Sequence, residues 1–156
     1  MDKNFKLTAY GKLTLSTIIS YMIMYIVMFL NVEEFSHVYS SLTRMYMTFL
    51  MVAPMVILKL MFMWKMYPNK ELNYGIATGS IGVFILFLFL LRTQTPIGDL
   101  QYMKAMIPHH SSAIMTSSNA KLEDEEVRKL ADEIIEAQVK EINEMKAMIQ
   151  RLESAE

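Results

Sequence analysis

Residues 103–115, which read MKAMIPHHSSAIM, gather side chains that bind soft metal ions in a chain that contains no cysteine. Thioethers suit Cu(I), and neutral imidazole binds copper, zinc, nickel and iron, so this mixture favours copper. Successive residues of a helix are rotated by about 100°, so a helix here would place some of these side chains on one face and others on the opposite side. The shared arc holds Tyr102, Met103, Met106, His109, His110, Ala113 and Ser117, and the residues that point away are Lys104, Ser111 and Met115. Ordinary core packing of the methionines, with histidines that cap or pack, is the alternative.

A carboxylate and a further methionine fall on the apolar face of the next predicted helix. Gln138 and Glu141 interrupt an apolar stripe, and a carboxylate that faces a core is costly unless it is paired, hydrogen-bonded or bound to a metal. We therefore expect Glu141 and Met145 to share the environment of the histidines. In the alternative, Glu141 caps a histidine or an arginine, or reaches solvent. The stripe consists of Val127, Leu130, Ala131, Ile134, Ile142, Met145, Met148, Ile149 and Leu152.

The expected alignment of these two helices keeps the histidines apart from Glu141. In a hairpin with its turn near residue 121, His109 and His110 would lie level with residues 130–134. At about 1.5 Å per residue, Glu141 would then lie roughly 10 to 15 Å away, too far for a shared metal. This predicts either two sites, or one site that a second copy of the chain completes, with the histidines carrying most of the affinity and Glu141 in a secondary role.

The elements that must position these residues are all helical. Three apolar runs are long enough to cross a membrane, and a polar, acidic segment follows them. The first run is not followed by a small-residue cleavage site, which favours a retained span over a signal peptide. The predicted parts are a membrane region over 1–92 with spans at 13–30, 45–63 and 74–91, a linker at 93–98, and a helical hairpin domain over 99–156 with helices at 99–119 and 123–152.

The fold class is therefore all-α, with an incomplete C-terminal core. Two helices of this length bury little apolar surface by themselves. A second copy of the hairpin would complete a four-helix bundle, so the sequence predicts a homodimer or a higher homo-oligomer.

Lysines predict the orientation in the bilayer. Lys3, Lys6 and Lys12 precede the first span, and Lys65 and Lys70 separate the second from the third. Cytoplasmic loops are enriched in such residues, so the N-terminus is expected in the cytoplasm and residues 93–156 outside the cell (inner) membrane. Lys59 lies near a span end, where its side chain is expected to reach toward the headgroups.

Composition narrows the function classes. The net charge is −1 and no long Lys/Arg block occurs, so nucleic acid is not an expected partner. The absence of cysteine excludes disulfides and thiolate catalysis. An enzyme is the least supported class, because no phosphate loop or nucleophile motif is present and a di-iron site would need repeated Glu-x-x-His motifs.

The motif MIPHH, followed by Ala113-Ile114 and later by LADEII and Gln138, resembles the bacterial domain-of-unknown-function family numbered 305. The resemblance covers about residues 99–152. It implies a ferritin-like helical bundle outside the membrane and a role in copper binding or resistance, as in the CopM-like members. The family motif falls on Met106, His109, His110, Gln138, Glu141 and Met145, while Thr116 stands where the family often has methionine.

These observations predict a membrane-anchored metal-binding protein that handles copper through a Met/His site. The alternative is a structural membrane oligomer, or an accessory subunit, without bound metal.

Overall fold

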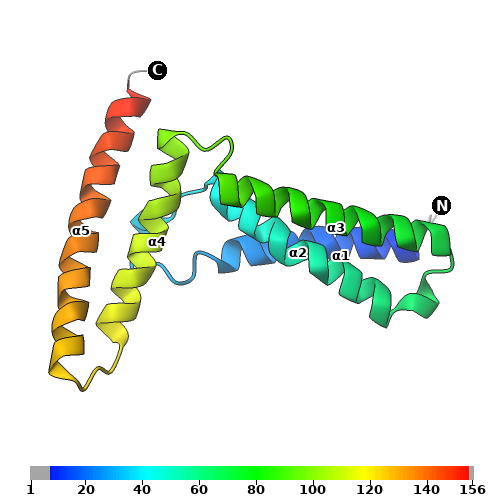
Figure 1. The fold of residues 1–156 in the computed structure, drawn as a ribbon, viewed down its shortest axis with the longest axis horizontal. Helices are drawn as coiled ribbons and strands as arrows, with labels where there is room; N and C mark the ends of the chain where they lie inside the picture. Colours follow the sequence, from blue (N-terminus) through cyan, green and yellow to red (C-terminus); the bar gives the residue numbers. More distant parts are fainter. Residues whose placement is uncertain (1–7, 155–156) are drawn as a thin grey trace, which may run out of the picture. The chain divides into compact units, whose positions relative to one another are not determined.

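The computed structural model describes residues 8–154, and that part of the chain is helical, with no strand. The all-α prediction is confirmed. The elements are α1 (Ala9–Val27), η1 (Phe35–His37), α2 (Leu42–Phe62), η2 (Trp64–Met66), α3 (Lys70–Thr93), α4 (Asp99–Asn119) and α5 (Glu125–Glu153), of which η1 and η2 are short 3-10 helices (Figure 1).

The chain divides into two compact units. The membrane unit comprises the described residues up to 27 together with 45–95, and the hairpin unit comprises 28–44 together with the described residues from 96. Residues 28–41, called the connecting loop below, join α1 to α2 in sequence but, like the first three residues of α2, belong to the unit of the hairpin. The sequence predicts a membrane region over all of residues 1–92, and that region includes this loop.

The membrane unit consists of α1, α2 and α3, each long and apolar enough to cross a membrane. The three apolar helices expected from the sequence are therefore present, with different ends. The side chain of Asn69 caps α3 by accepting the Leu72 N–H at 3.0 Å, so this helix begins several residues before its apolar run. Polar capping, which hydropathy does not register, sets this boundary.

Polar contacts join the helices of the membrane unit. The Lys59 ammonium donates to the hydroxyls of Ser16 and Ser20 on α1, at 3.2 and 3.3 Å. The Tyr10 hydroxyl donates to Asn73 Oδ1 at 2.8 Å, and the Asn73 side chain is fully buried. The start of α1 therefore lies beside the start of α3.

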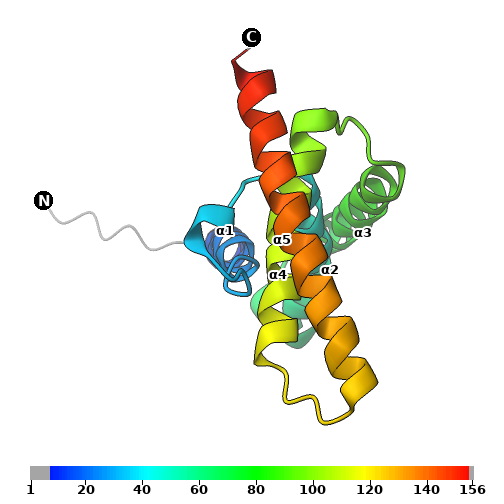
Figure 2. The ribbon, with the colours of Figure 1, turned by 90° about the vertical axis from the view of Figure 1, so that its left-hand side faces the viewer.

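The hairpin unit is built on α4 and α5, which lie side by side (Figures 1 and 2). Asp124 caps α5 by accepting the Val127 N–H at 3.0 Å, and Glu125 and Glu126 occupy the positive end of the helix dipole. The buried core between the helices consists of Met103, Ile107, Ile114, Ile142 and Ile149.

The predicted apolar stripe of α5 is only partly buried. Ile142 and Ile149 lie in the core, and Met145 and Leu152 pack against it. Val127, Leu130, Ile134 and Met148 are exposed in the single chain. The burial of Ile134 between copies stays a prediction.

Candidate metal centre

His110 is held by both of its ring nitrogens. Its Nδ1 lies 3.0 Å from the Met106 carbonyl oxygen, one turn earlier on α4, and its Nε2 lies 2.6 Å from Glu141 Oε2 on α5. The residue is only 7% exposed, whereas the carboxylate side chain of Glu141 reaches solvent. The helix backbone therefore fixes the orientation of the ring, and Nε2 faces the carboxylate.

Both partners of this ring accept hydrogen bonds. A carbonyl oxygen and a carboxylate oxygen accept, so a ring N–H is the donor in such contacts, and the 2.6 Å between Nε2 and Oε2 is the length of a hydrogen bond. Metal-binding histidines usually donate their other ring N–H to a carbonyl or carboxylate, as Nδ1 does here.

The predicted separation of His110 from Glu141 is wrong. The expected register assumed a tight turn near residue 121, but Ala120 and Asp124 have extended backbones, with ψ values of 132° and 129°. The connection carries the chain past the end of α4 before α5 begins, and the Arg128 guanidinium donates to the Ala120 carbonyl at 3.2 Å. This shifts α5 by about seven residues, or roughly 10 Å, relative to the expected alignment.

The observed register places methionines on the neighbouring turns. Because α4 and α5 run in opposite directions, the residue four before His110 lies about level with the residue four after Glu141. These residues are Met106 and Met145, and both are partly buried. By the same alignment Met103 lies about level with Met148, so two methionine levels follow the histidine–carboxylate level.

The two adjacent histidines have different surroundings. His109 is exposed, and its ring centroid lies 5.9 Å from that of His110 in an edge-on arrangement. Met103 belongs to the apolar core, and Met145 packs against that core. Of the six predicted ligands, His110 and Glu141 are in direct contact, Met106 supplies a backbone contact, and Met103 packs as an ordinary core residue.

Within residues 8–154, no group of three or more His, Cys, Asp or Glu side chains is arranged to hold a metal ion. The pair of His110 and Glu141 therefore offers two donors per chain. Further ligands would have to come from methionine sulfur atoms or from a second copy of the chain.

Ser111, predicted to point away from the site, is fully buried. Its hydroxyl oxygen accepts the Glu33 N–H at 2.7 Å and lies 2.9 Å from His37 Nδ1. Ser111 does lie away from the His110–Glu141 contact, as the helical projection predicts, and it is buried because the connecting loop covers a second side of α4. His37 was visible in the sequence as a loop histidine after two glutamates, but nothing in the pattern indicated Ser111 as its partner.

His37 lies in an environment that opposes a positive charge. Burial lowers its pKa, the Lys146 ammonium lowers it further, and the carboxylates of Glu34 and Glu33 oppose these effects. Its Nε2 is 3.7 Å from Glu34 Oε2, which is too long for a hydrogen bond.

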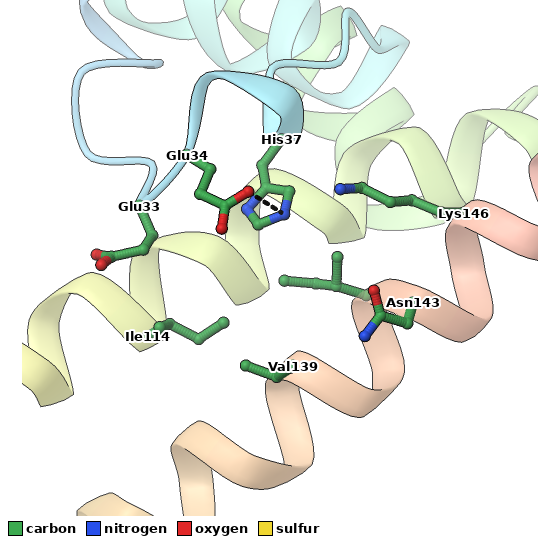
Figure 3. A pocket seen from close by; sticks show the side chains of 8 residues that line it. Glu33, Glu34, His37, Ile114, Val139, Asn143 and Lys146 are labelled. Carbon is green, nitrogen blue, oxygen red and sulfur yellow. Dashed lines mark ion pairs between the residues drawn. The ribbon is translucent and has the colours of Figure 1, made fainter.

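A pocket of about 250 Å³ lies beside His37. Glu34 and Lys146 approach the His37 ring from different sides, and Ile114 and Val139 form an apolar wall (Figure 3). The Glu33 carboxylate points away from these groups in the same view. The position of Lys146 makes the pocket a poor place for a metal cation.

Comparison with known proteins identifies the region that contains this site. The domain of unknown function (DUF305) matches residues 91–156. An uncharacterized protein, L153, of Acanthamoeba polyphaga mimivirus is 36% identical over 110 residues, which cover 69% of this chain and 70% of that protein. The aligned stretch is longer than the matched domain, so the similarity extends into the membrane unit. No solved structure matches the chain.

Proposed function

The chain belongs to the DUF305 family, and from this membership and the contact between His110 and Glu141 we propose that it is a membrane-anchored protein that binds or handles copper. The contact between an imidazole nitrogen and a carboxylate across α4 and α5 is the observation that carries the proposal. The sequence resemblance to copper-binding members of the family supports the same metal.

The residues around His110 fit a copper ion in the character of their donors. Nε2 faces away from its own helix, and Nδ1 is already fixed by the Met106 carbonyl. Met106 and Met145 lie about one helical turn away along their helices, and soft sulfur donors favour Cu(I) over hard cations. We assign the main contribution to His110, supporting roles to Glu141, Met106 and Met145, and a minor role to Met103 and the exposed His109.

The adjacent histidines provide a matched test. The full-length chain in detergent micelles would be titrated with Cu(I) against a competing chelator, as the parent, as His110→Ala and as His109→Ala. We expect the His110 variant to lose on the order of 100-fold in affinity, by loss of a ligand that supporting contacts orient. The His109 variant should change by less than about threefold, since its side chain is exposed.

Two results would contradict the assignment. Equal losses in both variants would mean that the histidines act as a pair, as the sequence alone suggests. Parent-like binding when both are replaced by alanine would remove the metal proposal. The structural membrane oligomer without metal would then take its place, and the His110 contact would be a helix–helix clamp.

The proposed topology places the N-terminus in the cytoplasm and the hairpin unit outside it, in a multi-pass membrane protein. The Tyr10 contacts hold the start of α1, which carries Lys12, beside the start of α3 at Lys70, and this supports a topology in which these lysines share one side of the bilayer. Lys3 and Lys6 lie outside the described residues. A cysteine introduced at Ser154 should react with an impermeant reagent in intact cells; reaction only after lysis would reverse the orientation.

The exposed apolar residues at the start of α5 support self-association of the hairpin units. Val127, Leu130 and Ile134 recur at the spacing of one helix face and remain exposed in the single chain. We expect Ile134→Asp to reduce the oligomer to a monomer in detergent, measured by light scattering. An unchanged mass, with helicity retained, would argue against this interface.

A further inference from the structure

The connecting loop carries two large apolar side chains on its outer surface. Phe35 is 95% exposed and Leu30 is 76% exposed. Another aromatic residue of the loop, Tyr39, does pack against the core of α4 and α5. Phe35 and Leu30 do not take such positions.

Three hydrogen bonds join the same loop to the hairpin. The Asn31 amide donates to Ser112 Oγ at 2.8 Å, and the Glu33 N–H donates to Ser111 Oγ at 2.7 Å. Ser36 Oγ accepts from the Lys146 ammonium at 3.2 Å. These bonds hold the loop to the hairpin, while Phe35 and Leu30 stay exposed to the surroundings and make no contact with the hairpin core.

Covalent connection places this loop next to hydrocarbon. The loop follows α1 directly after Val27 and leads into α2 at Leu42. Both helices are apolar enough to cross a membrane. Phe35 is eight residues from one span and seven from the other. Aromatic residues are enriched where spans meet the headgroup region, since that region accepts a ring beside polar groups.

We propose that the outer surface of the connecting loop, formed by Phe35 and Leu30, inserts into the headgroup region of the bilayer and holds the loop against the membrane. The inward hydrogen bonds then tie the hairpin to a segment that lipid holds at the surface. This contact is independent of copper.

Spin labels can test the lipid contact because the chain has no natural cysteine to compete for the label. Phe35→Cys and Leu30→Cys would be labelled separately in the full chain in phosphatidylcholine vesicles. Collision with oxygen, which concentrates in lipid, would be compared with collision with a water-soluble nickel chelate. Lys129→Cys is the control, because its side chain is 80% exposed on α5 and far along the chain from any span.

We expect the oxygen-to-nickel collision ratio at residues 35 and 30 to exceed that at residue 129 by several-fold. Ratios equal to that of the control would place the loop in water and overturn the proposal. Low collision with both reagents would also overturn it, because a second copy or another protein would then cover the surface. Circular dichroism of each labelled variant should match the parent, and two independent label positions guard against a local effect of either substitution.

Discussion

Two histidines of the hairpin unit, His110 and His37, are equally buried, at 7% exposure, but have opposite surroundings. The His110 ring faces a carbonyl and a carboxylate. The His37 ring faces the Ser111 hydroxyl, and burial first, then the Lys146 ammonium, lowers its pKa against the opposing effect of Glu34. The Glu141 carboxylate favours a positive charge near the His110 ring, whereas burial and the Lys146 ammonium disfavour a positive charge on the His37 ring.

The comparison teaches that burial of a histidine does not by itself indicate a metal ligand. His110 and Ser111 are consecutive residues of α4, yet one contacts α5 and the other contacts the connecting loop. The side of the helix decides which partners the imidazoles meet. A carboxylate partner makes His110 the better candidate for a cation, and a cationic neighbour argues against His37.

The largest effect that would sharpen this comparison is expected from Ser111→Ala. The substitution removes the acceptor of the Glu33 N–H and the partner of His37 Nδ1, and both groups are at least partly buried. Unpaired groups of this kind cost about 2 kcal/mol. Hydrogen exchange at the Glu33 amide should therefore become roughly 30-fold faster, as measured by NMR in detergent micelles.

Ser112→Ala serves as the control, because Ser112 accepts from Asn31 at an exposed position. It should leave the exchange of the Glu33 amide nearly unchanged. Equal acceleration in the two variants would mean that the loop is held by general packing, and that the contrast between the two sides of α4 has no energetic basis.

A smaller effect is expected from Glu141→Gln. The amide keeps the shape of the side chain but removes the negative charge facing His110 Nε2. We expect Cu(I) affinity to fall by about tenfold, the size usual for loss of a supporting contact. Glu144→Gln, one turn further along α5 and exposed, should bind copper as the parent does. Parent-like affinity in Glu141→Gln would leave His110 without an electrostatic advantage over His37.

The pH dependence of the loop contact should be smaller again. Because the pKa of His37 is lowered in the folded chain, its neutral form supplies stability that is present above the ordinary pKa near 6.5 and is lost as pH falls through the folded value. Protection of the Glu33 amide should therefore decline on acidification. His37→Gln should flatten this decline and His109→Gln should not. A decline of equal size in both variants would assign it to other groups.

The smallest effect is expected at the ion pair between Lys104 and Glu153, which joins α4 and α5 at 2.7 Å on the surface. Solvent screens such pairs, so Lys104→Ala should lower the free energy of unfolding by no more than about 0.5 kcal/mol. Thermal unfolding followed by circular dichroism would measure this. A large loss would mean that a surface pair, rather than core packing, sets the register that brings His110 to Glu141.

Part of the candidate site was predictable from local patterns. The interruption of an apolar stripe by Glu141 predicted a partner for its carboxylate, and the contact with His110 supplies one, although the side chain is half exposed and does not face the core. The partner of His37 was not predictable in this way. The sequence placed Ser111 away from the Met/His arc without naming a partner, and the return of the connecting loop to α4 buries it.

The sequence by itself determined the helical class, the three apolar helices and the existence of a hairpin, because each depends on the periodicity and length of apolar runs along a single segment. Only the tertiary structure decided which residues meet. A short extended connection at 120–124 moved α5 by about two turns, and the connecting loop covered a second side of α4. Helix register and loop packing depend on contacts between segments that are distant in sequence, and the residue pattern of one segment does not predict such contacts.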